Sequence, residues 1–139
     1  MKKTFIILLF IVAISAKSSA QLVIKINNIT SIQGDLHIGI YDDPEVFLSL
    51  TEQYIFILKR VDSIEMLIVI DTIPKGNYAI SIMHDLNSNG EMDFNFFGMP
   101  QEPYGFSNNL NPHFRAPRFK ESQFYYDGNY FELEIILLD

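Results

Sequence analysis

The sequence contains no cysteine among its 139 residues. This absence excludes a disulfide framework, a thiolate zinc site, a catalytic thiol and a lipid-modified N-terminal cysteine. Positive charge is also scarce, because 10 lysines and arginines stand against 17 aspartates and glutamates, and the formal net charge is −7. A chain this acidic is a poor ligand for a phosphate backbone, so we expect no nucleic-acid partner.

Charged residues of either sign make up only 19% of the chain, whereas hydrophobic residues make up 48%. This composition is too apolar for a disordered polypeptide. The length is typical of one domain.

Long apolar runs are limited to one, near the N-terminus. Residues 1–3 are a short basic start, residues 5–14 are an unbroken apolar run, and residues 18–20 are small. This order is typical of a secretory signal peptide. Because a membrane span needs roughly 20 apolar residues, the run is too short to be a transmembrane anchor.

We therefore expect residues 1–20 to be a signal peptide and residues 21–139 to form a single β-sandwich domain with no membrane span. The mature protein would lie in the periplasm or outside the cell. Its net charge would fall from −7 to −10, because the removed segment contains no acid and three lysines, Lys2, Lys3 and Lys17.

The rest of the chain alternates between short apolar segments and turns. Alternating or β-rich patterns occupy seven segments: 22–26, 36–40, 54–58, 64–70, 78–83, 123–126 and 129–138. No segment has the pattern of a long helix. The sequence therefore predicts an all-β fold, an antiparallel β-sandwich of about seven strands in the immunoglobulin-like class.

Turn residues predict how some strands are connected. The turn at 31–35 would join its flanking strands as a hairpin, and Asp127-Gly128 would join the last two strands in the same way. Asp43 followed by Pro44 is typical of a capped helix start, so residues 44–49 are expected to form one or two helical turns.

Residues 84–119 contain no strand-like run but are rich in aromatic side chains. A segment this long and this aromatic is not disordered. We expect it to form one long ordered loop that packs over one end or one edge of the sandwich.

This long loop begins with a regular pattern of oxygen-bearing side chains: Asp85, Asn87, Asn89 and Asp93. The pattern matches the first nine positions of a calcium-binding loop, with Gly90 at the position that needs a left-handed turn. The main-chain carbonyl of Glu91 would supply another ligand. Calcium prefers such hard oxygen donors in six- to eight-fold coordination.

The pattern is incomplete, because Phe96 stands where a helical calcium hand has its bidentate glutamate. The remaining ligand would come from elsewhere, with four candidates: Asp42, Asp43, Asn95 and Glu102. With two carboxylates in the loop, the expected affinity is micromolar to millimolar. The alternative is that Asn89-Gly90 is an ordinary turn whose side chains bond to nearby backbone.

Two histidines are relevant to this loop. His84 lies beside Asp85 at a predicted strand end and is a candidate for orienting its carboxylate. His37 lies on the polar side of a strand and is expected at the surface.

The run from His84 through Asn109, with the segments 40–42, 47–48 and 73–78, resembles the signature of a family of secreted bacterial proteins, domain-of-unknown-function family 2141. The resemblance covers essentially the whole mature chain, and residues 102–109 are its most specific part. It implies export and a small β-sandwich, but no activity.

The turn at 73–78 is also similar to those of transthyretin-like and carboxypeptidase regulatory-type sandwiches. That similarity concerns the fold alone. In this chain Lys75 separates Pro74 from Gly76.

Residues 102–109 allow two interpretations. In the first they form a ligand-binding lip, in which Tyr104 and Phe106 offer flat faces and Asn108 and Asn109 offer amides. In the second the aromatic rings plug the open end of the sandwich.

We expect an exported binding or accessory module with a calcium loop and an envelope or extracellular partner. One alternative is an envelope-associated hydrolase that uses residues of the 84–118 loop, such as Ser107 with His84 or His113. No nucleophile-elbow pattern surrounds Ser107, so we assign no catalytic residue. A purely structural envelope protein is the other alternative.

Overall fold

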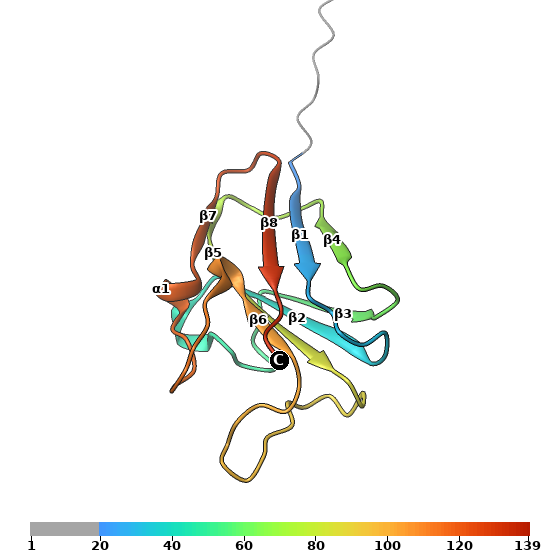
Figure 1. Ribbon diagram of the computed structural model, residues 1–139. Coiled ribbons are helices and arrows are strands. Elements are labelled where there is room, and N and C mark those ends of the chain that lie inside the picture. Colours follow the sequence, from blue (N-terminus) through green and yellow to red (C-terminus); the bar gives the residue numbers. More distant parts are fainter. Residues whose placement is uncertain (1–19) are drawn as a thin grey trace, which may run out of the picture.

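The computed structural model describes residues 20–139 (Figure 1). The expected signal peptide therefore lies outside the described residues, apart from its last position. Within the described part, no helix is long and apolar enough to cross a membrane.

The described residues form eight strands and three short helical segments. The strands are β1 (Leu22–Asn27), β2 (Asp35–Tyr41), β3 (Ile55–Arg60), β4 (Met66–Ile70), β5 (Gly76–Asp85), β6 (Tyr104–Phe106), β7 (Phe124–Tyr126) and β8 (Phe131–Ile136). The helical segments are η1 (Pro44–Val46), η2 (Ser107–Asn109) and α1 (Phe119–Ser122).

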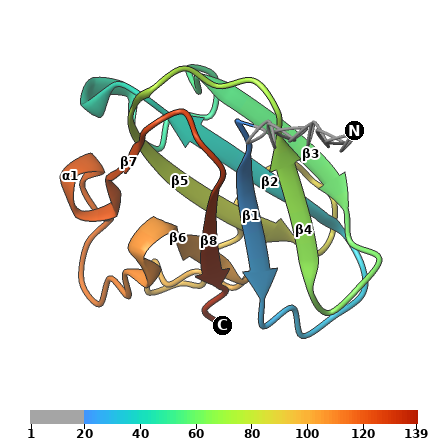
Figure 2. The same cartoon turned by 90° about the horizontal axis from the view of Figure 1, so that it is seen from above.

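The strands form two sheets that lie one over the other (Figure 2). One sheet has the order β4-β1-β8, and the other has the order β3-β2-β5-β6. β7 pairs with the first residues of β5, and β6 pairs further along the same strand. Every pair of named strands is antiparallel except β1 with β8, which run parallel.

The hydrophobic core lies between the two sheets. Because successive side chains of a strand point to opposite faces, the alternating pattern gives each sheet one apolar face. Isoleucines and leucines of β1, β4 and β8 meet those of β2 and β5 in one buried cluster that includes Ile24, Ile68, Ile135, Ile38 and Ile80. The predicted all-β sandwich is confirmed, with eight strands in place of about seven. The segment 84–119, expected to be one long loop, contains the short strand β6, which pairs with β5.

Both predicted hairpins are wrong. β1 and β2 belong to different sheets, and so do β7 and β8. The turns at 31–35 and 127–128 carry the chain from one sheet to the other. An alternating pattern determines which face of a strand is buried, but it does not determine the strand's partner.

The expected helix start is present, but the helix is shorter than expected. The carboxylate of Asp43 accepts a hydrogen bond of 2.9 Å from the N–H of Glu45, and Pro44 occupies the first helical turn. The segment ends at Val46, and Leu48 has a left-handed φ of 71°.

Gly34 lies where the chain passes the end of β5. Its φ is +68°, and a Cβ at this position would lie 2.0 Å from the backbone oxygen of Asp85. Only glycine therefore allows this close approach.

We predict that Gly34→Ala lowers the free energy of unfolding by about 1–3 kcal/mol, because it adds a backbone clash to a left-handed conformation. Gly98→Ala is the matched control, since Gly98 has a φ of +76° and no atom within 4 Å of the added Cβ. Urea unfolding of both variants measures the difference. Equal losses would contradict the clash.

Candidate functional site

The oxygen-rich loop, residues 85–93, begins at the last residue of β5. Asp85 is completely buried, and its two carboxylate oxygens accept hydrogen bonds from the N–H groups of Asn89 (3.1 Å) and Gly90 (2.7 Å). Gly90 adopts a φ of +84°, as its position in the pattern requires. These bonds curl the backbone around the Asp85 carboxylate.

Three further side chains of the pattern come together on the outer side of this curl. The side-chain amides of Asn87 and Asn89 donate hydrogen bonds of 2.6 Å and 3.1 Å to the carboxylate of Asp93. Oδ1 of Asn87 accepts from the same Asn89 N–H that Asp85 binds, at 3.0 Å. Oδ1 of Asn89 accepts from the N–H of Glu91, at 2.9 Å. The side chain of Glu91 itself is exposed.

A second buried carboxylate holds both ends of the loop. Oε1 of Glu102 accepts from the N–H of Leu86 at 2.8 Å, and Oε2 accepts from the N–H of Asp93 at 3.2 Å. Of the four candidates for an additional ligand, Glu102 is the one with these direct bonds to the loop. Asp43 caps η1, and Asn95 binds backbone N–H groups of its own turn.

Two residues that sequence reasoning did not connect to the loop contact it from β2. Nε2 of His37 lies 3.2 Å from Oδ2 of Asp85, and Asp35 accepts a hydrogen bond of 2.6 Å from Ser88. His84, the residue expected to orient the Asp85 carboxylate, makes no hydrogen bond to it among the described residues, so this expectation is wrong. His84 is buried, and its Nε2 donates to the backbone oxygen of Gln33 at 2.8 Å.

A large open groove of about 950 Å³ lies beside the oxygen-rich loop. Its floor includes outward-facing residues of β2 and β5, such as His37, Tyr41, Ser81 and Met83. The remaining lining residues come from the segments 48–56, 90–100 and 112–117 and from β6.

Most of the side chains that line the groove are apolar, but the floor also contains polar groups. The hydroxyl of Tyr41 donates to the backbone oxygen of Ser49 at 3.0 Å, and burial raises the pKa of this hydroxyl. The ring of Tyr41 lies over Gly39, because a Cβ at residue 39 would come within 2.7 Å of the Tyr41 hydroxyl. The absence of a side chain at residue 39 therefore shapes the floor of the groove.

Arg115, in the 112–117 segment, forms a bidentate ion pair with Glu121. Nη1 and Nη2 of Arg115 donate hydrogen bonds of 2.8 Å and 2.6 Å to the two carboxylate oxygens. These bonds hold the pKa of Glu121 at about 2. The pair therefore stays charged at neutral pH.

The four residues predicted as a ligand-binding lip divide into two groups. Tyr104 and Phe106 line the groove. The amide of Asn108 donates to the backbone oxygens of Glu121 and Gln123. The side chain of Asn109 accepts from the N–H of Ile136 at 2.8 Å and donates to the backbone oxygen of Glu134 at 3.1 Å.

The proposed nucleophile Ser107 also binds backbone. Its hydroxyl accepts from the N–H of Ile80 at 2.9 Å and donates to the backbone oxygen of Ser122. In the described part of the chain, Ser107 has no hydrogen bond to a histidine. His113 lines the groove, whereas Ser107 does not.

Comparison with known protein families gives a match. A family model described as "Uncharacterized protein conserved in bacteria (DUF2141)" matches residues 24–133. Neither a curated protein nor a solved structure matches the chain.

We predict that Glu102→Gln lowers the free energy of unfolding by about 1–3 kcal/mol, because the amide group has one acceptor oxygen for the two N–H groups that Glu102 holds. Backbone hydrogen exchange at Leu86 or Asp93 should become faster. Glu91→Gln, in the same loop, is the control and should leave both amides protected. Unchanged exchange at Leu86 and Asp93 in Glu102→Gln would contradict the predicted role.

Proposed function

The chain belongs to the DUF2141 family of uncharacterised bacterial proteins, and we propose that it is an exported binding module whose oxygen-rich loop binds calcium. The family description assigns no activity. The proposal therefore rests on the chemistry of the loop and of the groove beside it.

The observation that supports calcium binding is the convergence of Asn87, Asn89 and Asp93 outside the curl closed by Asp85. Among residues 20–139, no three histidine, aspartate or glutamate side chains are arranged to hold a metal ion by themselves. Amide and main-chain oxygens would therefore complete the site. These are the hard donors that calcium accepts together with carboxylates.

The donor set would fit the ion after two side-chain amides rotate. A half-turn of the Asn87 and Asn89 amides would direct both oxygens toward the carboxylate of Asp93, and it would release the bonds that these oxygens accept from the N–H groups of Asn89 and Glu91. The cation would then replace the amide protons as the partner of that carboxylate. The carbonyl of Glu91 would add a main-chain ligand.

The charge around the loop also favours a cation. Four carboxylates, those of Asp35, Asp85, Asp93 and Glu102, form hydrogen bonds with residues of the loop. Arg60 lies 3.7 Å from Asp35, and the ring of His37 lies 3.2 Å from Asp85. A divalent ion would offset the remaining repulsion.

A binding role is supported by the position of the loop. Gly90, Glu91 and Met92 belong to the loop and also line the groove. An ion in the loop would therefore stiffen one wall of a site whose volume is typical of small-molecule pockets. Hydrolysis has less support, because the hydroxyl of Ser107 is used to hold backbone.

Export is supported by the basic, apolar and small-residue order of residues 1–20. The protein would act in the periplasm or outside the cell on an envelope or extracellular partner. We expect cleavage before Gln21, which mass spectrometry of the protein recovered from its bacterial host would detect. An intact N-terminus in that protein would contradict this prediction.

We predict that calcium raises the melting temperature of the protein and that Asp93→Asn abolishes the increase. An ion at a hundred times its dissociation constant adds about 2.7 kcal/mol to the free energy of unfolding. Thermal melts in millimolar calcium and in chelator measure the effect. Asp127→Asn is the matched control, because Asp127 accepts hydrogen bonds from Asn129 in a different turn.

The control should keep the full calcium response. A melting temperature that is the same in calcium and in chelator, together with no heat of binding at millimolar calcium, would leave the oxygen-rich loop as an ordinary turn.

A further inference from the structure

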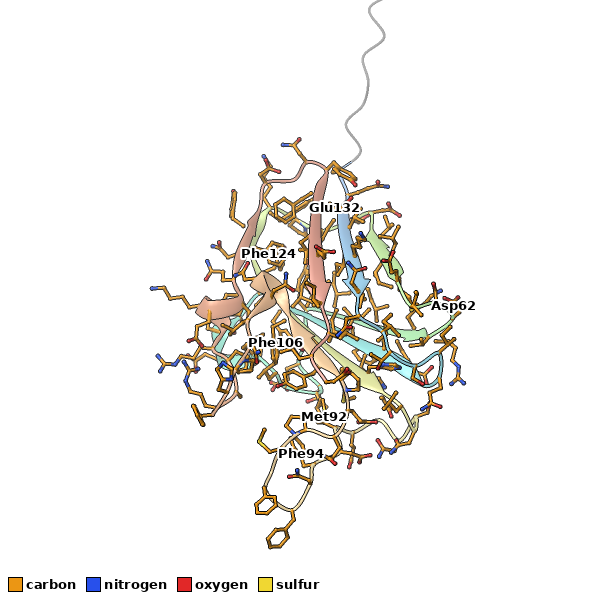
Figure 3. All side chains as sticks on the ribbon, in the orientation of Figure 1. Asp62, Met92, Phe94, Phe106, Phe124 and Glu132 are labelled. Atoms are coloured by element: carbon orange, nitrogen blue, oxygen red, sulfur yellow. The ribbon has the colours of Figure 1, made fainter. Side chains whose placement is uncertain are left out.

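The apolar tip, residues 94–100, follows the oxygen-rich loop, lines one side of the groove and projects past the end of the sheets. Figure 3 shows the segment that carries Met92 and Phe94 extending beyond the end of the sheets. Phe96 is 97% exposed and Phe97 is 84% exposed, while Phe94 and Met99 are also exposed. Large side chains this exposed, grouped on one projecting segment, indicate an interaction surface.

The backbone of the apolar tip is closed by its own hydrogen bonds. Oδ1 of Asn95 accepts from the N–H groups of Phe97 (2.9 Å) and Met99 (3.0 Å). The backbone of Asn95 exchanges further bonds of 2.9 Å with Met99 and Gly98. Four N–H groups of the seven-residue tip are therefore satisfied without water, while the rings of Phe96 and Phe97 meet edge to face at 5.6 Å between centroids.

The apolar tip contains no charged residue. The two nearest acids, Asp93 and Glu102, are held by hydrogen bonds within the adjoining loop. The most projecting part of an otherwise acidic protein is therefore neutral.

From these features we propose that the apolar tip inserts into the surface of a lipid bilayer of zwitterionic phospholipid, with the rings of Phe96 and Phe97 at the boundary between headgroups and acyl chains. An apolar phase requires that backbone polar groups be satisfied internally, and the Asn95 bonds meet much of this requirement. Zwitterionic lipid is the partner that suits a neutral tip on a chain of net charge −7, because anionic lipid would repel the chain. This inference does not depend on calcium binding.

Other occupants fit the apolar tip less well. A ligand in the groove would contact Phe94, Phe97 and Met99, which line it, but it would leave Phe96, which does not line it, uncovered. A stable protein partner, including a second copy of this chain, needs about 800 Å² from each side. A projecting tip of seven residues does not supply that area, whereas a bilayer deforms around it.

The chain contains no tryptophan, so Phe96→Trp creates a single fluorescent reporter at the apolar tip. On titration with phosphatidylcholine vesicles we expect a blue shift of its emission and quenching by brominated acyl chains. Leu67→Trp places the reporter on the outward face of β4, at a position that is 64% exposed, and should show neither change.

The double substitution Phe96→Ser with Phe97→Ser should lower the partition coefficient onto the same vesicles at least tenfold, because each buried ring contributes roughly that factor. Leu67→Ser should partition as the unaltered protein does. Melting curves of the variants should agree, since all three side chains are exposed.

Each measurement is made both in calcium and in chelator, which separates this inference from the calcium proposal. If the protein partitions onto vesicles in either buffer and the double substitution abolishes this partitioning, insertion is supported. If the emission of the Phe96→Trp variant shows no blue shift either in calcium or in chelator, the inference is overturned. The inference is also overturned if the protein does not bind vesicles but forms a dimer in sedimentation, and the double substitution converts this dimer to monomers. The occupant of the apolar tip would then be a second copy of the chain.

Discussion

Two buried carboxylates determine the shape of the loop on which the candidate site depends. A buried carboxylate is strongly destabilising unless hydrogen-bond donors surround it. Asp85 and Glu102 obtain such donors from the backbone of the loop itself, at Leu86, Asn89, Gly90 and Asp93. Because both acids are buried, the loop has to curl around them.

The sequence was sufficient to predict the all-β class and the left-handed turn at Gly90. Alternating apolar residues indicate directly which side chains are buried. The spacing of Asn87, Asn89 and Asp93 indicates that their side chains lie close together, as they do. The contacts of His37 and Asp35 with the loop could not be predicted, because they depend on the pairing of β2 with β5, residues nearly fifty positions apart. The groove escaped prediction for the same reason.

The segment with the most specific family resemblance, residues 102–109, has a structural role that its composition did not reveal. Ser107 holds β5, Asn108 holds the chain around α1, and Asn109 holds β8. Asn108 and Asn109 both have left-handed φ values, which asparagine tolerates better than most residues. Three adjacent polar side chains thus join three segments that are distant in sequence, and side-chain to backbone bonds of this kind leave no periodic pattern.

The parallel pairing of β1 with β8 joins the first and last strands of the described fold, from Leu22 beside Phe131 to Asn27 beside Ile136. Contacts that span so much of a chain form slowly, because a long loop must close before they can be made. During synthesis, β8 leaves the ribosome after the seven other described strands. The three-stranded sheet therefore stays incomplete until β8 has been made.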